Sequence, residues 1–519
     1  MSRRSANRAG VRQVAGPTDH VVVIGAGLSG LAAALYLRGE GHQVTVIEAQ
    51  RTPGGRVRTE SLGGHLFDTG ASVLTMPSLI EAPMSAVGIS AASTRALLDL
   101  SPLDPTYHLR YADGTDFAVD RDTDALASSI GSVFGSAQEQ GYRRLRTWLE
   151  HLYDVEFDDF IDRNFDRLTD FVDNSEMRTR VGQLVRMGAV RHLTPAIGRF
   201  ISDTRLQRAF TFQALYAGVP PSRALAIYAV ISQMDIGMGV WYPRGGMGRI
   251  GAVMAQAFTA AGGTILYGHP ARRIEFDRSA PGLPRAVAVQ TDTCEINCDA
   301  VIVTTDTPVT AALLADVPAT RSRRRTRHSP SAVVTHLTVP AEVGAAWPGG
   351  HHTIDFGEAW EETFRELTAR SGRLMSDPSL LLNRPGLTDP DHFIVDGRES
   401  VTVLAPCPNL DSADLPWDAL ARPYVAEVLS VLESRGYRGI AETARIERID
   451  HPGVWAASGM SAGTPFAAAH TLSQTGPLRA TNLWPGAANV VFAGSSTVPG
   501  VGIPPVLVSG RLAAERITG

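Results

Sequence analysis

The stretch from His20 to Glu48 constrains the fold more than any other part of the chain. A short apolar run, Val21–Ile24, leads into the glycine turn Gly25-Ala26-Gly27-Leu28-Ser29-Gly30, and an Ala/Leu-rich segment and a second apolar run follow. The order is strand, glycine turn, helix, strand and acidic residue. This order predicts a βαβ unit that binds a dinucleotide.

Each residue of the motif has a physical reason to be there. Gly25 permits a tight turn, Gly27 lets the backbone approach a pyrophosphate, and Gly30 lets the helix pack on the sheet. The helix that begins near Leu28 directs free N–H groups and the positive end of its dipole at the phosphates. Glu48 is expected to accept hydrogen bonds from the ribose hydroxyls, and its charge would repel a 2′-phosphate.

A second glycine pair follows the βαβ unit. Gly54-Gly55-Arg56 comes where a cofactor longer than adenosine would continue, and nicotinamide enzymes have no general need for it. In this element the sequence resembles flavin oxidoreductases with the amine-oxidase type of fold. The resemblance implies FAD rather than NAD, with Gly54, Gly55 and Arg56 among its contacts.

Two further segments are expected to reach the flavin. A strand ending at Asp68 returns the backbone towards it and makes Gly70, Ala71 and Ser72 candidates. Near the C-terminus a buried strand, Asn489–Gly494, a rigid loop to Pro505 and a closing helix, 506–517, form a site for anionic or carbonyl oxygen. The candidates there are Gly494, Ser495, Gly502, Ile503 and Pro504.

Four strand-like runs in the middle of the chain are expected to complete the FAD-binding sheet. They are Thr264–Tyr267, Ala271–Ile274, Ala286–Thr291 and Ala300–Asp306. Ala271, which begins the second of these runs, is a further candidate contact of the cofactor.

The segment from Asp122 to Gly237 has helical periodicity. Aromatic and aliphatic residues recur at spacings of three or four over 157–171, with aspartates between them, which predicts a packed helix with a solvated acidic face. Residues 180–210 form a basic amphipathic pair of helices, the second capped by Thr194 and running through Phe210. Such a pair can lie in a membrane interface or pack on the core with its basic side in solvent.

Composition excludes several functions. All 48 basic residues are arginine, so no lysine Schiff base and no P-loop can form. The net charge of −5 gives no basis for nucleic-acid binding. Cys294, Cys298 and Cys407 lack the partners of a zinc site and are expected to be reduced thiols of a cytosolic protein. No run of 18 apolar residues predicts a membrane span.

Three motif blocks together resemble the bacterial phytoene desaturase family. They are the N-terminal glycine motifs, GVWYPRGGM over 239–247, and AGSSTVPGVGIPPVLVSG over 493–510; the segments 202–207 and 216–221 are also similar. The likeness runs from about residue 20 to 517. Two departures, Val498 where the family often has histidine and Ala71-Ser72 where it usually has proline, leave the substrate's length and the number of steps open.

The resemblance implies an activity, a substrate and a location. A carotenoid precursor such as phytoene would lose a hydride to flavin N5 and a proton from the adjacent carbon, giving a conjugated double bond. The partners implied are a long apolar isoprenoid substrate and oxygen or a quinone as electron acceptor. The protein would be bacterial and cytoplasmic, with a peripheral membrane contact. The residues do not identify a catalytic base.

The expected fold class is α/β, with a Rossmann-type FAD-binding domain, an interleaved substrate domain built on a mixed β-sheet, and a helical insertion. The FAD-binding parts are predicted at 20–90, 239–315 and 486–519, and the substrate domain at 91–121, a β-hairpin region, and 316–485. The helical insertion, facing substrate or membrane, spans 122–238, and residues 1–19 form a disordered leader.

Three alternatives stay open. A redox-neutral carotenoid isomerase or a saturase would use the same fold and flavin. Amine oxidases resemble one another in a lysine near flavin N5, which this chain does not contain. Prenyl-binding escort proteins share the fold without flavin, but they lack an intact glycine loop.

Overall fold

A five-stranded parallel sheet forms one end of the fold. The computed structural model describes residues 12–171, 174–215, 217–317 and 326–519. The strands follow the order β20-β13-β1-β2-β9, all parallel, and span β1 His20–Ile24, β2 Gln43–Glu48, β9 Thr264–Tyr267, β13 Ala300–Val303 and β20 Val490–Phe492. The sheet therefore collects strands from both ends and the middle of the chain.

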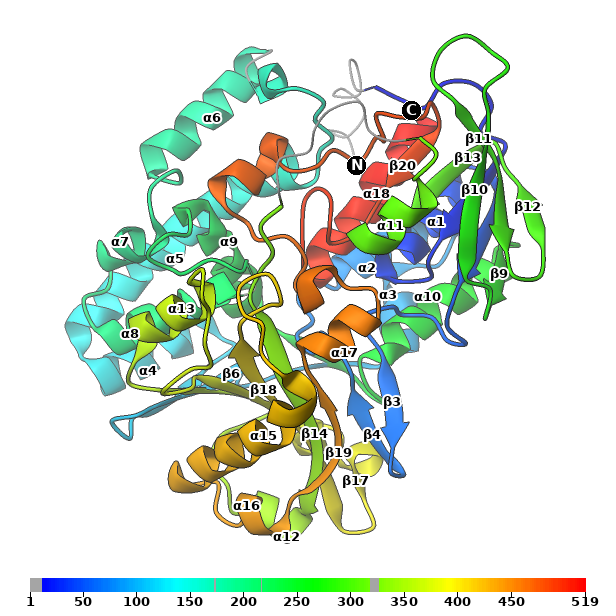
Figure 1. The fold of residues 1–519 in the computed structure, drawn as a ribbon. Helices are drawn as coiled ribbons and strands as arrows, with labels where there is room; N and C mark the ends of the chain where they lie inside the picture. The colour runs from blue at the N-terminus through cyan, green and yellow to red at the C-terminus, as the bar shows by residue number, and fades with distance from the viewer. Residues whose placement is uncertain (1–11, 172–173, 216, 318–325) are drawn as a thin grey trace.

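The two faces of β1 pack against different layers because successive side chains alternate across a strand. Val21 and Val23 belong to the core under the helices α1 (Leu28–Gly39), α10 (Gly248–Ala260) and α18 (Ile503–Thr518). Val22 and Ile24 belong to a second core on the opposite face. Figure 1 shows α18 lying along α1, so the C-terminal helix covers the N-terminal motif.

The second core is covered by a separate three-stranded antiparallel sheet, β10 Ala271–Asp277, β11 Arg285–Thr291 and β12 Glu295–Asn297. β10 and β11 were predicted to belong to the parallel sheet, and that prediction was wrong. Ile274 and Val289 pack face to face on Val22 and Val301 instead of extending the sheet's edge. The helix α11 (Thr307–Leu313) joins this layer through Leu313.

An eight-stranded mixed sheet forms the centre of the rest of the molecule. Its order is β19-β14-β18-β16-β15-β6-β7, with β17 paired to β18. The strands are β6 Tyr107–Tyr111, β7 Asp116–Val119, β14 Ser331–Pro340, β15 His352–Phe356, β16 Leu380–Asn383, β17 Ile394–Val395, β18 Arg398–Cys407 and β19 Arg445–Asp450. β6 and β7 form the predicted β-hairpin. β14 pairs with β18, and α15 (Trp417–Ser434) packs on these two strands through Val425 and Val428.

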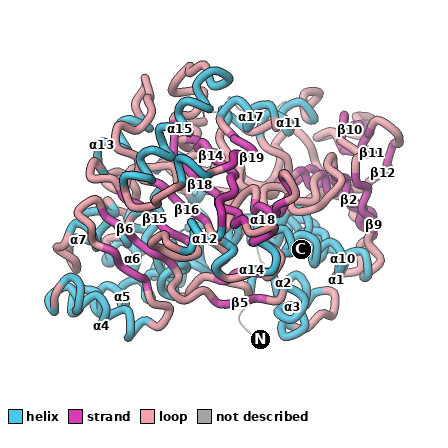
Figure 2. Tube along the Cα trace, turned by 90° about the horizontal axis from the view of Figure 1, so that it is seen from below, coloured by secondary structure: helices cyan, strands magenta, loops and turns pink. Residues whose placement is uncertain are grey.

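Short elements connect these layers. Two-stranded ribbons pair β3 Thr59–Leu62 with β4 His65–Asp68, and β5 Leu100–Pro102 with β8 Trp241–Pro243. The connecting helices are α2 Ser78–Ala86, α3 Ala91–Leu98, α12 Ala341–Ala345, α13 Trp360–Thr368, α14 Pro390–Phe393, α16 Ile440–Thr443 and α17 Pro452–Ala457. Figure 2 places the β10–β12 sheet and the helices α4 and α5 at opposite ends of the molecule.

The helical segment consists of α4 Thr123–Phe134, α5 Ser136–Glu156, α6 Ser175–Met187, α7 Leu193–Gly198, α8 Thr204–Ala209 and α9 Val230–Ser232, with π-helical turns at Phe157–Ile161 and Gln233–Gly237. The single helix predicted from Thr194 to Phe210 is broken, because Asp203 caps a new start by accepting from the N–H groups of Arg205 and Leu206. Among the described residues no helix is long and apolar enough to cross a membrane.

The acidic segment 157–171 also differs from its prediction. It is a π-helical turn followed by a loop and a short 3₁₀ turn, Leu168–Phe171, rather than one helix. Two of its aspartates pair with arginines: Asp159 with Arg180 at 2.9 Å, and Asp162 with Arg511 at 2.7 Å. Asp158 stays exposed, as predicted. These ion pairs connect the acidic segment 157–171 to α6 and α18.

Part of the predicted disordered leader is ordered. The N–H of Val14 donates to the carbonyl oxygen of Arg516 at 2.9 Å, and that of Ala15 to the carbonyl of Ala488 at 3.3 Å. Residues 12–15 therefore lie along the end of α18. The first eleven residues of the leader lie outside the described residues.

Candidate functional site

The predicted glycine turn lies between the end of β1 and the start of α1. Gly25 has φ +110°, and a Cβ on it would lie 2.3 Å from Thr304 Oγ1. A Cβ on Gly30 would lie 2.0 Å from the carbonyl oxygen of Gly25. Both positions therefore exclude any side chain, and they explain why the turn holds its shape.

Gly27 differs from its two neighbours in the motif. Its backbone is extended, it precedes α1, and no side chain caps the first N–H groups of that helix. The nearest heavy atom to a Cβ on Gly27 would be Gly55 Cα, at 3.8 Å. The protein itself leaves room for a side chain at Gly27, so the glycine fits a close approach by a ligand to the helix start.

Glu48 ends β2 directly beside this turn. Its carboxylate is buried, and it accepts hydrogen bonds from the N–H of Ala26 at 2.7 Å and from the N–H of Gln50 at 2.8 Å. A carboxylate has about four acceptor positions, so two stay available for the hydroxyls of a ribose. The bond to Ala26 adds a structural role that sequence analysis did not foresee.

The second glycine pair lies on the first. Gly27 and Gly54 form a parallel β-bridge, and the N–H of Gly54 donates to the carbonyl of Ala26 at 2.9 Å. On the other side, a Cβ on Gly251 of α10 would lie 2.7 Å from Gly54 Cα. Gly251, which sequence analysis missed, allows the helix to support the turn from behind.

Arg56 connects this turn to the C-terminal segment. Its guanidinium forms an ion pair with Asp306 and donates to Ser495 Oγ at 3.0 Å. Asp306 also accepts from the hydroxyls of Ser461 at 2.9 Å and Ser496 at 3.0 Å. Burial raises the pKa of Asp306, but Arg56, the N–H of Thr307 and the hydroxyl of Ser461 together lower it more, so the pKa lies below its ordinary value.

The C-terminal segment lies against the start of α1. A Cβ on Gly494 would lie 3.4 Å from Ser29 Oγ and 3.5 Å from the carbonyl oxygen of Thr304. Gly502, with φ +118°, leads directly into α18, whose first residues are Ile503 and Pro504. The structure therefore places Gly494 beside the start of α1, whereas Gly502, Ile503 and Pro504 lie further along the segment, where α18 begins.

The Asp-x-Gly element reaches the same place from β4. A Cβ on Gly70 would lie 1.9 Å from the carbonyl oxygen of Arg56, and the N–H of Ala71 donates to that oxygen at 3.2 Å. The carbonyl of Ser72 accepts from His352 Nε2 at 3.2 Å, so this element bridges the glycine motifs and the eight-stranded sheet.

Ala271 is the predicted cofactor contact that comes from the middle of the chain. It begins β10, two residues after His269, whose N–H donates to the carbonyl of Glu48 at 2.9 Å. The structure thus brings the start of β10 close to Glu48 at the end of β2.

Buried polar groups between the helical segment and the eight-stranded sheet were not predicted. Tyr107 donates to Asp235 Oδ2 at 3.3 Å, and burial raises the pKa of Asp235 to about 7. Burial lowers the pKa of His352 to about 4, so this imidazole is neutral at neutral pH. Burial therefore favours the protonated form of the Asp235 carboxyl over its charged form.

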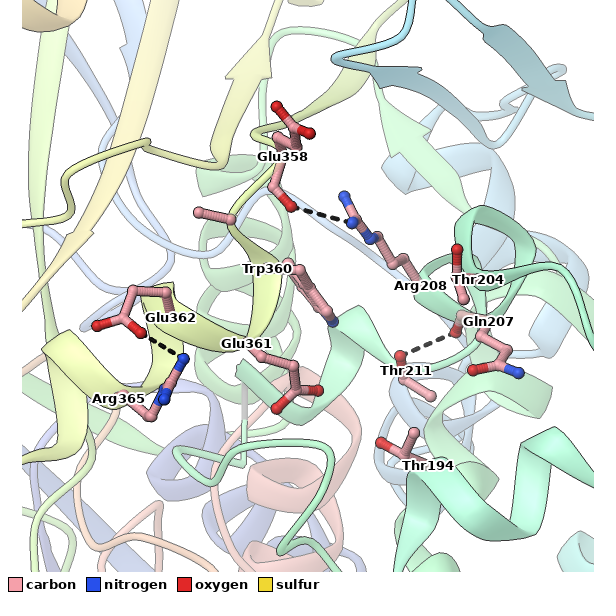
Figure 3. Close-up of a pocket in the computed structure, with 11 residues that line it drawn as sticks. Thr194, Thr204, Gln207, Arg208, Thr211, Glu358, Trp360, Glu361, Glu362 and Arg365 are labelled. Carbon is pink, nitrogen blue, oxygen red and sulfur yellow. Dashed lines mark hydrogen bonds and ion pairs between the residues drawn. The ribbon is translucent and has the colours of Figure 1, made fainter.

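A separate cavity of about 450 Å³ opens between α8 and α13. Figure 3 shows Glu361 and Trp360 on one side of it and Gln207 and Thr211 on the other. Arg208 donates to the carbonyls of Gly357 and Glu358 at 2.8 and 3.1 Å. None of the predicted cofactor residues lines this cavity.

Comparison with known proteins agrees with this geometry. The family model described as flavin containing amine oxidoreductase matches residues 28–518. A phytoene dehydrogenase from Streptomyces griseus is 48% identical over 98% of this chain and 96% of its own. A lycopene-forming phytoene desaturase from a Paracoccus species is 30% identical over 95% and 96%.

A solved structure shows the same fold at lower sequence similarity. An oxidoreductase from Methanosarcina mazei superimposes with a TM-score of 0.56 at 16% identity, covering 95% of this chain and 99% of its own. The α/β fold expected from the sequence is confirmed, and the glycine cradle fits a flavin dinucleotide. The chain belongs to the flavin containing amine oxidoreductase family, among its phytoene desaturases, and is an FAD-dependent oxidoreductase.

Proposed function

We propose that this chain is a desaturase that introduces conjugated double bonds into a carotenoid precursor such as phytoene. The observation that carries the proposal is the nearly full-length likeness, at 48% identity, to the phytoene dehydrogenase of Streptomyces griseus. The glycine motifs, Glu48 and Arg56 also support the proposal, because they fit the FAD that such a desaturase needs.

The reaction divides the work between cofactor and chain. When bound, FAD supplies the hydride acceptor for oxidation of a CH–CH group. Gly27, Gly54 and the start of α1 would hold its diphosphate, and Glu48 its ribose. The residues around the Asp-x-Gly element and the aromatic interior near Tyr107 would orient the polyene and exclude water.

Burial of the substrate supplies most of its affinity. A C40 polyene has several hundred Å² of apolar surface, and at about 25 cal/mol/Å² its burial is worth on the order of 10 kcal/mol. The conjugated chain stabilises the allylic cation itself, so the protein mainly positions the reacting carbons and keeps water away.

Product analysis tests the proposal. The chain is expressed in a host that accumulates phytoene, and the extracted carotenoids are separated and their absorbance spectra recorded. We expect products absorbing at longer wavelength, because each new double bond lengthens the conjugated system. Unchanged conjugation with altered geometry would identify an isomerase, and shortened conjugation a saturase. A purified protein without flavin absorbance would favour a prenyl-binding role.

Turnover under air, compared with anaerobic turnover with a quinone, identifies the electron acceptor.

We further propose that α6 and the turn that follows it, up to Arg191, contact a membrane interface, since the substrate dissolves in lipid. Val185 and Val190 are 53% and 59% exposed, and the arginines 186 and 191 beside them are exposed as well. An exposed apolar pair flanked by cations is the pattern of an interfacial helix. In Figure 1, α6 lies at the outer edge of the molecule.

Vesicle sedimentation tests this contact. We expect the wild-type protein to sediment with vesicles containing anionic lipid, and the variant Val185→Asp/Val190→Asp to lose at least tenfold in partition. A matched control, Val287→Asp, changes another exposed valine, 40% exposed on β11, and should bind as the wild type does. Equal sedimentation of all three proteins would contradict the proposed surface.

A further inference from the structure

Two arginines from different parts of the chain meet at Ser495. Arg56 donates to the side-chain oxygen of Ser495 at 3.0 Å, and Arg479 donates through its Nη2 to the carbonyl oxygen of the same residue at 2.7 Å. Gly494, the preceding residue, lies against Ser29 at the start of α1. Ser495 therefore joins two cations directly beside the dinucleotide turn.

The two arginines differ in their counter-charge. Arg56 forms an ion pair with Asp306. Arg479 is only 4% exposed, its Nε donates to the carbonyl of Thr497 at 2.8 Å, and its remaining acceptors are main-chain carbonyls as well. Among the described residues no carboxylate lies within ion-pair distance of Arg479. A buried cation held only by carbonyls is costly to the fold.

The titratable side chains around Arg479 do not balance its charge. Tyr228 and His470 pack edge to face with ring centroids 5.4 Å apart. Burial raises the pKa of Tyr228, and burial together with Arg479 lowers the pKa of His470, so both are neutral at neutral pH. Burial lowers the pKa of Arg479 itself to about 10, and the guanidinium stays protonated. The segment 495–497 is therefore hydrogen-bonded to the guanidinium of Arg479, whose positive charge has no counter-ion among the described residues.

We propose that Arg479 is a positioning residue for the cofactor, which fixes the segment 495–497 and stabilises the reduced flavin with its charge. Oxidised flavin that takes up two electrons and one proton gains one negative charge, and a fixed cation nearby favours that state. A charge without a counter-ion acts at longer range than one neutralised in an ion pair, as Arg56 is by Asp306. The inference rests on FAD binding but not on the carotenoid substrate.

Equilibration of the holoenzyme with a two-electron reference dye tests the charge. The ratio of reduced to oxidised flavin is compared at a fixed ratio of reduced to oxidised dye. We expect this flavin ratio to be at least tenfold lower in Arg479→Met than in the wild type, which corresponds to a reduction potential about 30 mV lower. Arg479→Lys, which keeps the charge, should stay within threefold of the wild type. The control Arg398→Met removes an arginine that also donates to two carbonyls, those of Thr338 and Thr443, and should leave the ratio unchanged. A wild-type ratio in Arg479→Met would overturn the proposal.

A measurement on the wild type keeps the proposal testable if Arg479→Met does not fold. The reduced holoenzyme is titrated with acid and its absorbance recorded. We expect the spectrum of the anionic reduced flavin to persist below the pH at which free reduced flavin becomes neutral. Appearance of the neutral spectrum at the same pH as free flavin would overturn the proposal. Neither readout uses a carotenoid, so a chain without desaturase activity leaves both of them valid.

Discussion

Replacing Gly27 with alanine is expected to weaken FAD binding strongly while leaving the fold intact. The backbone at Gly27 is extended, with φ −70° and ψ 170°, and the nearest heavy atom to the new Cβ is 3.8 Å away. Alanine is therefore compatible with the folded chain, and it restricts the unfolded chain, which stabilises proteins by about 0.4–1 kcal/mol. The methyl group would project where the diphosphate is expected to approach the helix start.

The expected loss of FAD affinity is at least about 100-fold, or roughly 2.7 kcal/mol. It is measured by titrating the purified apoprotein with FAD and following flavin fluorescence, with thermal unfolding of the apoprotein recorded in parallel. Gly182→Ala is the matched control: Gly182 lies inside α6 with nothing within 4 Å of its Cβ position, so this change should leave FAD affinity unchanged. Full flavin binding by Gly27→Ala would contradict the predicted diphosphate site.

Gly30→Ala separates the two kinds of glycine in the motif. Its Cβ would lie 2.0 Å from the carbonyl of Gly25, so this change should disturb the fold as well as the site. Sequence analysis assigned packing to Gly30 and ligand approach to Gly27, and the structure agrees on the first point. The role of Gly27 towards the cofactor stays a prediction. The FAD titration of Gly27→Ala tests whether the space beside this glycine is filled by the bound cofactor.

The parallel sheet was predictable because its signals are local. β1 is a short apolar run followed directly by Gly25, β2 is one that ends at Glu48, and β1, α1 and β2 follow one another along the chain. The pairing and packing of strands that are distant in sequence were less predictable. β10 and β11 have the same alternating pattern whether they extend the parallel sheet or pack on its face, and only their burial against Val22 and Val301 decides between the two.

The site was predictable where a turn needs glycine. It was not predictable where side chains from distant parts of the chain contact each other. Glycines at a strand–helix junction, such as Gly25, and glycine pairs shortly after a strand, such as Gly54-Gly55, carry a sequence signal, so both turns were found. Asp306 lies 250 residues from Arg56, and its local signal, an aspartate before Thr-Pro at a helix start, indicates only a cap. The acidic stretch 157–171 was misread for the same reason, since the arginines that pair with it come from α6 and α18.

The substitution Asp306→Asn is expected to destabilise the fold and weaken FAD binding together. Asp306 joins the Gly54–Arg56 turn, the end of β13 and the C-terminal segment through Arg56, Ser461 and Ser496. Its side chain is 5% exposed and that of Arg56 is 30% exposed. Removing one partner of a buried ion pair costs about 3–5 kcal/mol, and we expect about 2–4 kcal/mol here because water reaches Arg56.

The pH dependence of this loss identifies its electrostatic origin. Because the pKa of Asp306 is lower in the folded chain, its ionised form contributes stability above the unfolded pKa of about 4. That contribution disappears as the pH falls through the lower, folded pKa. The free energies of unfolding of wild type and Asp306→Asn, measured in urea at several pH values, should therefore differ most near neutrality and converge in acid. The control Asp292→Asn, in an exposed pair with Arg272, should leave the urea midpoint unchanged at every pH. A pH-independent difference for Asp306→Asn would mean that the contact acts through shape rather than charge.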